Sequence, residues 1–268
     1  LQSLPGSWQR IDAVIARNSA STAQIAEAVA GDPSLAARLL RLANSPMFGL
    51  SQRVERLSQA VHLIGTRQLR ELALAASVVD LVTGGERRGR VAAFLRHSTA
   101  TALCARAIAS RRREANVERF FVAGLLHDIG LFAFELAEPA LAELVAARAR
   151  ERLEPLEQVE VDMLGYDHGA VGAALLARWN LPAALAEPVG HHHRPTAAPT
   201  HRVESAVVHV ASLTIELLGL GGDHGVSTPL DVAAWELCGL DAPGLVAAAS
   251  EIEAALDETL AILTGAAA

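Results

Sequence analysis

A histidine–aspartate pair is the sharpest chemical motif in the chain. His127-Asp128 is followed by Ile129-Gly130 and preceded by an apolar run. An imidazole can bind one metal ion, while a neighbouring carboxylate can bridge two ions or orient a water molecule. A His-Asp pair also arises by chance, so the motif alone fits both a metal site and an ordinary pair of polar residues.

Three further segments offer imidazole groups. His97 lies upstream on a predicted helix, His168 follows downstream, and the cluster His191-His192-His193 comes last. A helical bundle can bring such separated segments together, so we expect a common site with these candidate metal ligands: His97, His127, Asp128, His168 and His192. The alternative is that some of these histidines cap helices and that the triple cluster is a solvated turn.

Helices must position these residues, because the composition favours an all-α fold. Hydrophobic residues make up 51% of the chain, many of them alanine, while aromatic residues make up 4%. Alanine is the best helix former, and long alternating runs of β-branched residues are absent. Asp32-Pro33 predicts a capped helix start, and Ser250 and Glu253 have the spacing of a capping box.

The chain is predicted to have two parts. The Gly- and charge-rich residues 84–90 are interpreted as a loop between an N-terminal helical subdomain (1–83) and a helical bundle (91–268). Nine of the ten histidines follow this loop, so any chemistry is expected in the second part. Helices are predicted there over 91–110, 118–127, 139–152, 169–179, 182–192 and 203–218.

Charge and hydropathy argue against two classes of protein. The formal net charge is −7, whereas a nucleic-acid binder usually carries a basic surplus. No run of about 20 apolar residues lacks charges, and no signal peptide is evident, so we expect no membrane span and a cytoplasmic location. Cys104 and Cys238 match no metal-binding spacing and are predicted to be buried free thiols.

Several motifs occur in a fixed order along residues 4–218. They are Asp32–Ser45, Ala60–Gly65, Arg67–Arg70, Ala123–Gly130, Asp167–Gly172, Trp179–Pro182 and His192–Pro195. Together with the histidines, they resemble the HDOD (HD-related output domain) family, a branch of the HD superfamily of metal-dependent phosphohydrolases. The resemblance implies an all-α, HD-type helical bundle with an additional N-terminal helical subdomain.

The chain departs from the catalytic members of that superfamily at three positions. Ser212 stands where the resemblance places the Asp that closes the metal site. In the cyclic-dinucleotide phosphodiesterase branch, Lys stands at the position of Leu131 and Glu at that of Arg194. The Gly-Tyr-Pro signature of that branch is also absent. A neutral hydroxyl is a poor ligand beside a carboxylate, so the resemblance points to a degenerate metal site.

The charge of the expected ligands also bears on how many ions they can hold. Two divalent ions bring four positive charges, and only Asp128 among the matched positions supplies a negative one. A dinuclear site is therefore disfavoured, and one divalent transition metal ion held mainly by imidazoles remains open. His209 lies one helical turn before Ser212 and is either a substitute ligand or an ordinary packed residue.

Two functions from different classes follow from the resemblance. The first is a non-catalytic output domain of bacterial signal transduction, acting through a signalling protein partner or a small regulatory ligand, with no nucleic-acid or membrane binding. The alternative is a phosphohydrolase with an atypical single-metal site, where Asp128 orients or deprotonates a metal-bound water that attacks phosphorus. The carboxylate missing at position 212 separates the two.

Overall fold

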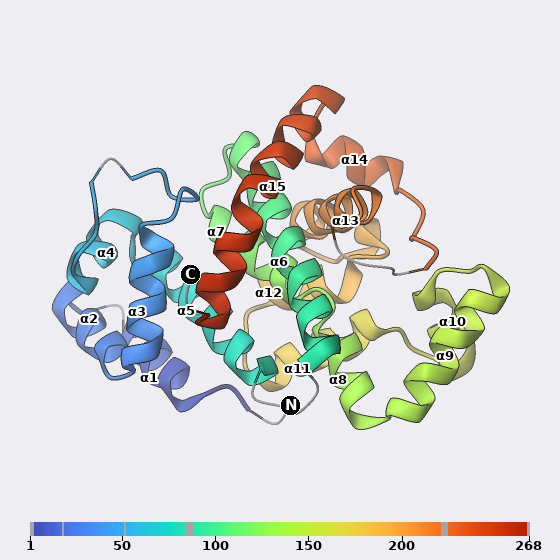
Figure 1. Ribbon diagram of the computed structural model, residues 1–268, viewed down its shortest axis with the longest axis horizontal. Helices are drawn as coiled ribbons and strands as arrows, with labels where there is room; N and C mark the ends of the chain where they lie inside the picture. The colour runs from blue at the N-terminus through green and yellow to red at the C-terminus, as the bar shows by residue number, and fades with distance from the viewer. Residues whose placement is uncertain (1–2, 18, 51, 84–87, 221–224, 267–268) are drawn as a thin grey trace. The chain divides into compact units, whose positions relative to one another are not determined.

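The computed structural model confirms the all-α fold class (Figure 1). It describes the chain except for residues 1–2, 18, 51, 84–87, 221–224 and 267–268. Within those limits the chain forms helices joined by loops. No strand occurs in this described part; one isolated parallel bridge joins Pro155 to Val226.

The chain divides into two compact units, residues 1–92 with 253–268, and residues 93–252. The first division lies close to the predicted start of the bundle at residue 91. Residues 253–268 belong to the first unit, although we expected them in the bundle. Of the predicted loop, residues 84–87 lie outside the described part, and 88–90 belong to a helix.

The first unit contains five complete helices and parts of two others. Asp32 Oδ1 accepts a hydrogen bond from the Leu35 amide at 3.1 Å, and Pro33 occupies the first turn. The predicted cap is therefore confirmed. The helices are α1 (Gly6–Ile15), α2 (Thr22–Ala30), α3 (Pro33–Ala43), α4 (Leu57–Ile64) and α5 (Thr66–Thr83), with the start of α6 (Arg88–Arg111) and the end of α15 (Ala242–Thr264).

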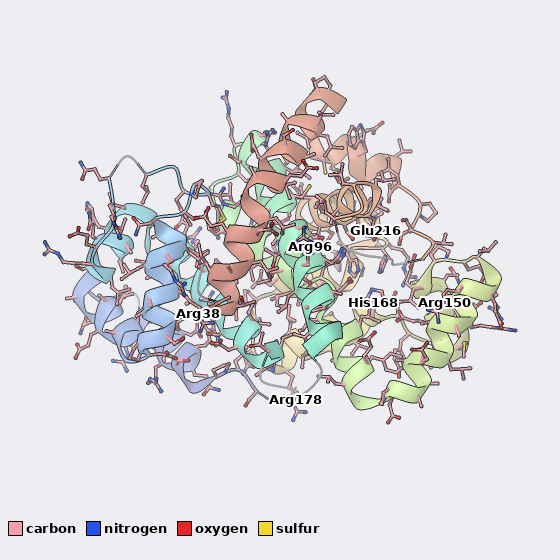
Figure 2. The ribbon with its side chains drawn as sticks, viewed as in Figure 1. Arg38, Arg96, Arg150, His168, Arg178 and Glu216 are labelled. Atoms are coloured by element: carbon pink, nitrogen blue, oxygen red, sulfur yellow. The ribbon has the colours of Figure 1, made fainter. Side chains whose placement is uncertain are left out.

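A buried arginine joins three helices of this unit. Arg38 on α3 is 2% exposed, and its guanidinium pairs with both carboxylate oxygens of Asp80 on α5. The same group donates to the carbonyl oxygens of Ala76 at 3.4 Å and Leu263 at 3.1 Å. Arg38, labelled in Figure 2, therefore connects α3, α5 and α15 through one charged side chain.

The second unit holds the remaining helices. The predicted helix over 139–152 agrees with the structure at both ends, whereas no helix was predicted over the residues that form α8, α10 and α14. Besides most of α6, the unit comprises α7 (Val117–Leu126), α8 (Ile129–Ala137), α9 (Pro139–Arg152), α10 (Leu156–Leu164), α11 (His168–Arg178), α12 (Ala183–His191), the short 3-10 helix η1 (Pro195–Ala197), α13 (Arg202–Leu217), α14 (Val232–Cys238) and the start of α15.

Glycines allow unusually close helix contacts in this unit. A Cβ atom at Gly130 would lie 2.0 Å from the carbonyl oxygen of His168, and one at Gly124 would lie 2.9 Å from the Cα of Ala102. Both separations are too short for any larger residue. Gly130 thus lets α8 approach the start of α11, and Gly124 lets α7 approach α6, so the glycines set the distances between the histidine-bearing segments.

The capping box predicted at Ser250 is wrong. Ser250 lies inside α15, where its hydroxyl donates to the Val246 carbonyl at 3.4 Å. The helix starts earlier, where Asp241 Oδ1 accepts from the Gly244 amide at 2.9 Å. Serine and glutamate three residues apart also fit the surface of an uninterrupted helix, so their spacing alone does not mark a start.

Among the described residues, one helical stretch, Val117–Ala137, is long and apolar enough to cross a membrane. A second candidate arises if the bent pair α14–α15 is counted as a single span. Of the most apolar 18 residues within Val117–Ala137, 67% are buried inside the protein. Val117–Ala137 comprises α7 and α8, and a core helix of a soluble protein passes the same test.

The cysteines are confirmed as buried free thiols, and burial raises the pKa of both Cys104 and Cys238 to about 12.

Candidate metal centre

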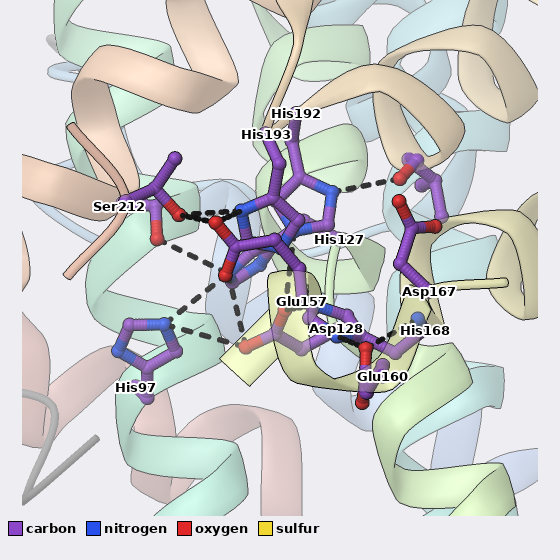
Figure 3. A network of polar contacts seen from close by, with 12 residues as sticks. His97, His127, Asp128, Glu157, Glu160, Asp167, His168, His192, His193 and Ser212 are labelled. Atoms are coloured by element: carbon purple, nitrogen blue, oxygen red, sulfur yellow. Dashed lines mark hydrogen bonds and ion pairs between the residues drawn. The ribbon is translucent and has the colours of Figure 1, made fainter. Parts of the chain in front are cut away.

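The five expected ligand residues converge in the second unit (Figure 3). His97 comes from α6, His127 directly follows α7, and Asp128 lies at the break before α8. His168 is the first residue of α11, and His192 directly follows α12. Part of the alternative interpretation holds, because His127 and His192 stand at the C-caps of α7 and α12, but His192 is 1% exposed and does not lie in a solvated turn.

Asp128 lies at the middle of the group. Its Oδ2 atom is 3.2 Å from Nε2 of His127 and 3.6 Å from Nε2 of His97. Its Oδ1 atom is 3.3 Å from Nε2 of His168 and 3.4 Å from Nε2 of His192. Each carboxylate oxygen thus faces a different pair of imidazoles.

Two groups of three residues bring ligand atoms within 4.8 Å of one another. One is His97, His127 and Asp128, and the other is His168, His192 and His193. Nε2 of His193 lies 2.8 Å from Nε2 of His168. His193 was not among the expected ligands, although its place in the triple histidine cluster was a signal that it could reach the site.

Backbone carbonyl groups fix the ring orientation of two histidines. Nδ1 of His127 donates to the Gly124 carbonyl at 2.8 Å, and Nδ1 of His192 donates to the Val189 carbonyl at 2.7 Å. In the neutral rings the proton therefore sits on Nδ1, and Nε2 presents a lone pair toward Asp128. Such outer bonds select the tautomer that binds metal.

A buried glutamate orients His168. Glu160 on α10 is 2% exposed, and its Oε2 atom accepts from Nδ1 of His168 at 2.7 Å and from the His168 amide at 2.8 Å. This carboxylate–histidine pair has the form that commonly supports metal-bound imidazoles. The sequence reading missed Glu160 because it gave no helix over residues 156–164.

A threonine and a second glutamate hold His193. Nδ1 of His193 lies 2.8 Å from Thr228 Oγ1, and the Thr228 hydroxyl donates to Glu157 Oε1 at 2.8 Å. Because the hydroxyl proton is directed at the carboxylate, the histidine acts as the donor to Thr228. Thr228 lies 35 residues after His193, and no short motif links the two.

The pKa values of the centre reflect its crowded charges. Burial acts to raise the pKa of Asp128, but the imidazoles of His127, His168 and His192 hold it well below its usual range. Burial acts to lower the pKa of His168, but Glu160 and Asp128 raise it well above its usual range. Burial and the neighbouring histidines hold the pKa of His193 well below its ordinary value.

The positions that depart from the catalytic pattern lie in different surroundings. Ser212 belongs to the centre, with its Oγ atom 3.4 Å from Nε2 of His127. Arg194 has a side chain 70% exposed and pairs with Asp167 Oδ2 at 3.0 Å, next to the centre but not in it. Leu131 lies on α8 and offers no ligand atom.

His209 is a packed residue and not a substitute ligand. Its Nδ1 atom donates to the His192 carbonyl at 2.7 Å, and its Nε2 atom accepts from the Asp231 amide at 3.0 Å. Both ring nitrogens are therefore occupied by the backbone. His209 supports the segment that carries His192 and leaves no lone pair for a metal ion.

The donor set fits a divalent transition metal ion. Nε2 of His192 is buried and has no hydrogen-bond partner among the described residues, although it points at the centre. A buried nitrogen without a partner is costly unless something else binds it. Imidazoles with one carboxylate suit ions such as Zn²⁺ or Fe²⁺.

Comparison with known sequences identifies relatives at low identity. A profile of the HDOD domain matches residues 1–195. An uncharacterised protein of Treponema pallidum is 28% identical over 219 residues, which is 80% of this chain and 42% of that protein. The chain therefore spans less than half the length of that relative.

Solved structures share the fold. An HDOD domain protein of unknown function from Geobacter sulfurreducens is 25% identical, with a TM-score of 0.74 over 97% of this chain and 91% of that one. A candidate phosphohydrolase from Shewanella amazonensis is 24% identical, with a TM-score of 0.76 over 100% and 95%. A candidate signal-transduction protein from Marinobacter aquaeolei is 21% identical, with a TM-score of 0.73 over 97% and 58%.

The profile match covers more than half of the chain, and the order of the motifs, the helical architecture and the convergent histidines agree with it. The chain belongs to the HDOD family.

Proposed function

We propose that this chain is a bacterial signal-transduction output domain whose centre binds one divalent transition metal ion without hydrolysing phosphate esters. The observation that carries the metal site is the orientation of the imidazoles. His127 and His192 place their Nδ1 protons on backbone carbonyls and turn Nε2 toward Asp128. Ligands held in this way need little further ordering when a cation binds.

Position 212 supports the non-catalytic part of the proposal. Among the described residues, Asp128 is the only carboxylate in close contact with the Nε2 atoms of the centre, and Ser212 offers only a hydroxyl. A bound ion would supply Lewis acidity to the centre. With one such carboxylate, a pair of divalent ions would remain poorly neutralised, and unbalanced buried charge costs several kcal/mol per ion, on the order of the desolvation penalty.

The output would be a binding event in the cytoplasm. The partner is a signalling protein or a small regulatory ligand, and the net charge of −7 disfavours nucleic acid. A similar solved chain is described as a candidate signal-transduction protein, which supports this class of role.

Elemental analysis of the purified chain tests the metal site, and a hydrolysis assay tests the lack of catalysis. We expect about one transition metal ion per chain in wild type and its loss in Asp128→Ala. Incubation with Mn²⁺ or Fe²⁺ and cyclic dinucleotides should give no linear product. Ser212→Asp should raise metal affinity if the centre has lost a closing carboxylate.

A metal-dependent phosphohydrolase is the second candidate function. It is favoured by the two groups of three ligands, which share contacts with Asp128 and could hold two ions. Hydrolysis that requires added metal and disappears in Asp128→Ala would establish this function and exclude the non-catalytic one.

A further inference from the structure

One face of α13 carries a carboxylate just beyond the metal centre. Ser212 and Glu216 are four residues apart and therefore lie on the same face of the helix. Glu216 is labelled in Figure 2. Neither its sequence position nor the family pattern marks it as part of the centre.

The Ser212 hydroxyl stands between this carboxylate and a ligand histidine. Its Oγ atom lies 3.4 Å from Glu216 Oε1 and 3.4 Å from Nε2 of His127. Both separations are longer than a well-formed hydrogen bond. The neutral His127 ring has its proton on Nδ1, bound to the Gly124 carbonyl, so Nε2 can only accept.

A single hydroxyl proton can serve only one of these two acceptors. A carboxylate is the stronger acceptor, because hydrogen bonds to charged groups are about twice as strong as neutral ones. The Ser212 proton is therefore directed at Glu216. This leaves a lone pair of the Ser212 oxygen facing His127 Nε2, which also lies 3.2 Å from Nε2 of His97. A cation bound among these three atoms would replace their contacts with one another.

The second oxygen of Glu216 is also in an unfavourable position. Oε2 is buried and has no hydrogen-bond partner among the described residues. Leaving a buried acceptor unsatisfied is unfavourable, and the cost is larger for a charged group. A positive charge bound in the neighbouring centre would offset this cost.

We propose that Glu216 supplies, through Ser212, the negative charge that the missing closing carboxylate would have provided. The proposal rests on the proposed metal binding and locates the ion in the group formed by His97, His127 and Asp128. With Asp128 and Glu216 both ionised, two negative charges balance one divalent ion. Glu216 acts as a positioning residue, since the oxygen facing the ligands belongs to Ser212.

Zn²⁺ affinity measured by competition with a chromophoric chelator tests the proposal. Glu216→Gln and Ser212→Ala should each weaken Zn²⁺ binding by about 10- to 100-fold, the range for outer residues that support metal ligands. The double variant should be no weaker than the singles, because both act through one contact. Glu236→Gln, an exposed change of equal charge on α14, is the matched control.

Rescue separates this role from a structural one. Ser212→Asp added to Glu216→Gln should restore affinity, and thermal melts in chelator should show Glu216→Gln folded and at least as stable as wild type. If Glu216→Gln binds Zn²⁺ as tightly as wild type does, the role of Glu216 is overturned, while the proposed metal site still stands. Wild type that binds neither Zn²⁺, Mn²⁺ nor Fe²⁺ would overturn the proposed function itself.

Discussion

The two compact units of this protein both bury ionisable side chains in helical cores, but they differ in how the charge is balanced. In the first unit, the Arg38 guanidinium meets the Asp80 carboxylate and two backbone carbonyls. In the second, one aspartate is surrounded by the Nε2 atoms of histidines, and those of His127 and His192 present lone pairs when the rings are neutral. Both terminal nitrogens of the Arg38 guanidinium bond to protein groups, and its Nε, a donor, is the one guanidinium nitrogen without a partner among the described residues. The first arrangement thus leaves no free acceptor for a cation, whereas the second calls for one.

This contrast teaches how to distinguish structural from functional buried charge. A buried ion pair whose groups bond only to protein stabilises one packing of the helices, and it leaves no atom for a ligand. In the centre of the second unit, Nδ1 of His127 and Nδ1 of His192 bond to backbone carbonyls, whereas Nε2 of His192 has no hydrogen-bond partner among the described residues. Variants in the first unit should therefore change the free energy of unfolding, and variants in the second should change metal affinity.

The largest effect is expected in the first unit, on stability. Asp80→Ala leaves the Arg38 guanidinium buried without a carboxylate. Removing one partner of a fully buried pair costs about 3–5 kcal/mol, and since solvent screens the half-exposed Asp80 we expect a cost at the lower end, about 3 kcal/mol. Arg38→Met should cost less, because the Asp80 side chain is 47% exposed and stays solvated. Urea unfolding followed by circular dichroism measures both.

The Arg70–Asp12 pair provides the control for this prediction. Its side chains are 24% and 37% exposed, so Asp12→Ala should cost no more than about 1 kcal/mol. Metal affinity should be unchanged in all three variants. A cost for Asp80→Ala no greater than for Asp12→Ala would mean that the Arg38 pair is not a stabilising element.

The second effect is on metal binding in the second unit. Asp128→Asn keeps the size of the side chain but removes the charge that all four expected histidines contact. Zn²⁺ affinity should fall by more than about 100-fold, beyond the range for outer residues. Asp162→Asn, at a side chain 46% exposed, is the control. Equal affinity for the two variants would contradict a metal site around Asp128.

The sequence predicted which residues converge at the centre, because their motifs are local, and their binding of a metal stays a prediction. His127-Asp128 follows an apolar helix, His97 lies within the predicted helix 91–110, and His168 directly precedes the predicted helix 169–179, one residue before its expected start. The supporting residues were not predicted. Glu160, Thr228 and Glu216 reach the centre through packing of distant helices and loops, and no spacing along the chain records which carboxylate meets which imidazole.

The structure also corrects the charge count made from the sequence. Counting matched positions gave one negative charge, at Asp128. Glu160 bonds directly to His168, and Glu216 contacts Ser212. A count of this kind needs the neighbours in space, because each buried carboxylate changes which cation the centre can hold.

The third effect is a pH dependence of stability in the metal-free protein. The pKa of His168 is raised in the fold by Glu160 and Asp128, in excess of the lowering by burial. A raised folded pKa contributes stability that is fully present below the unfolded value of about 6.5 and is lost as pH rises through the folded pKa. Stability from this group should therefore decline toward alkaline pH.

Glu160→Gln tests that dependence. The variant lacks the carboxylate that raises the pKa of His168, so it should lose most stability at and below neutral pH and approach wild type at alkaline pH. Urea unfolding across a pH series, with chelator present, gives the comparison. A stability difference that grows toward alkaline pH would have the wrong sign for a pair between His168 and Glu160.

The smallest effect is expected at the outermost contact of the centre. Thr228→Val keeps the shape of the side chain but removes the hydroxyl that accepts from His193 and donates to Glu157. His193 is then free to rotate, but it lies outside the group in which the ion is located, so Zn²⁺ affinity should fall by less than about tenfold, below the range for residues that support metal ligands. Thr228→Ser retains the hydroxyl and should bind Zn²⁺ as wild type does.

The Zn²⁺ affinity of Thr228→Val also separates the two groups of ligands. Because the Glu216 proposal locates the ion with His97, His127 and Asp128, an effect of Thr228→Val as large as that of Glu216→Gln would instead place the ion with His168, His192 and His193.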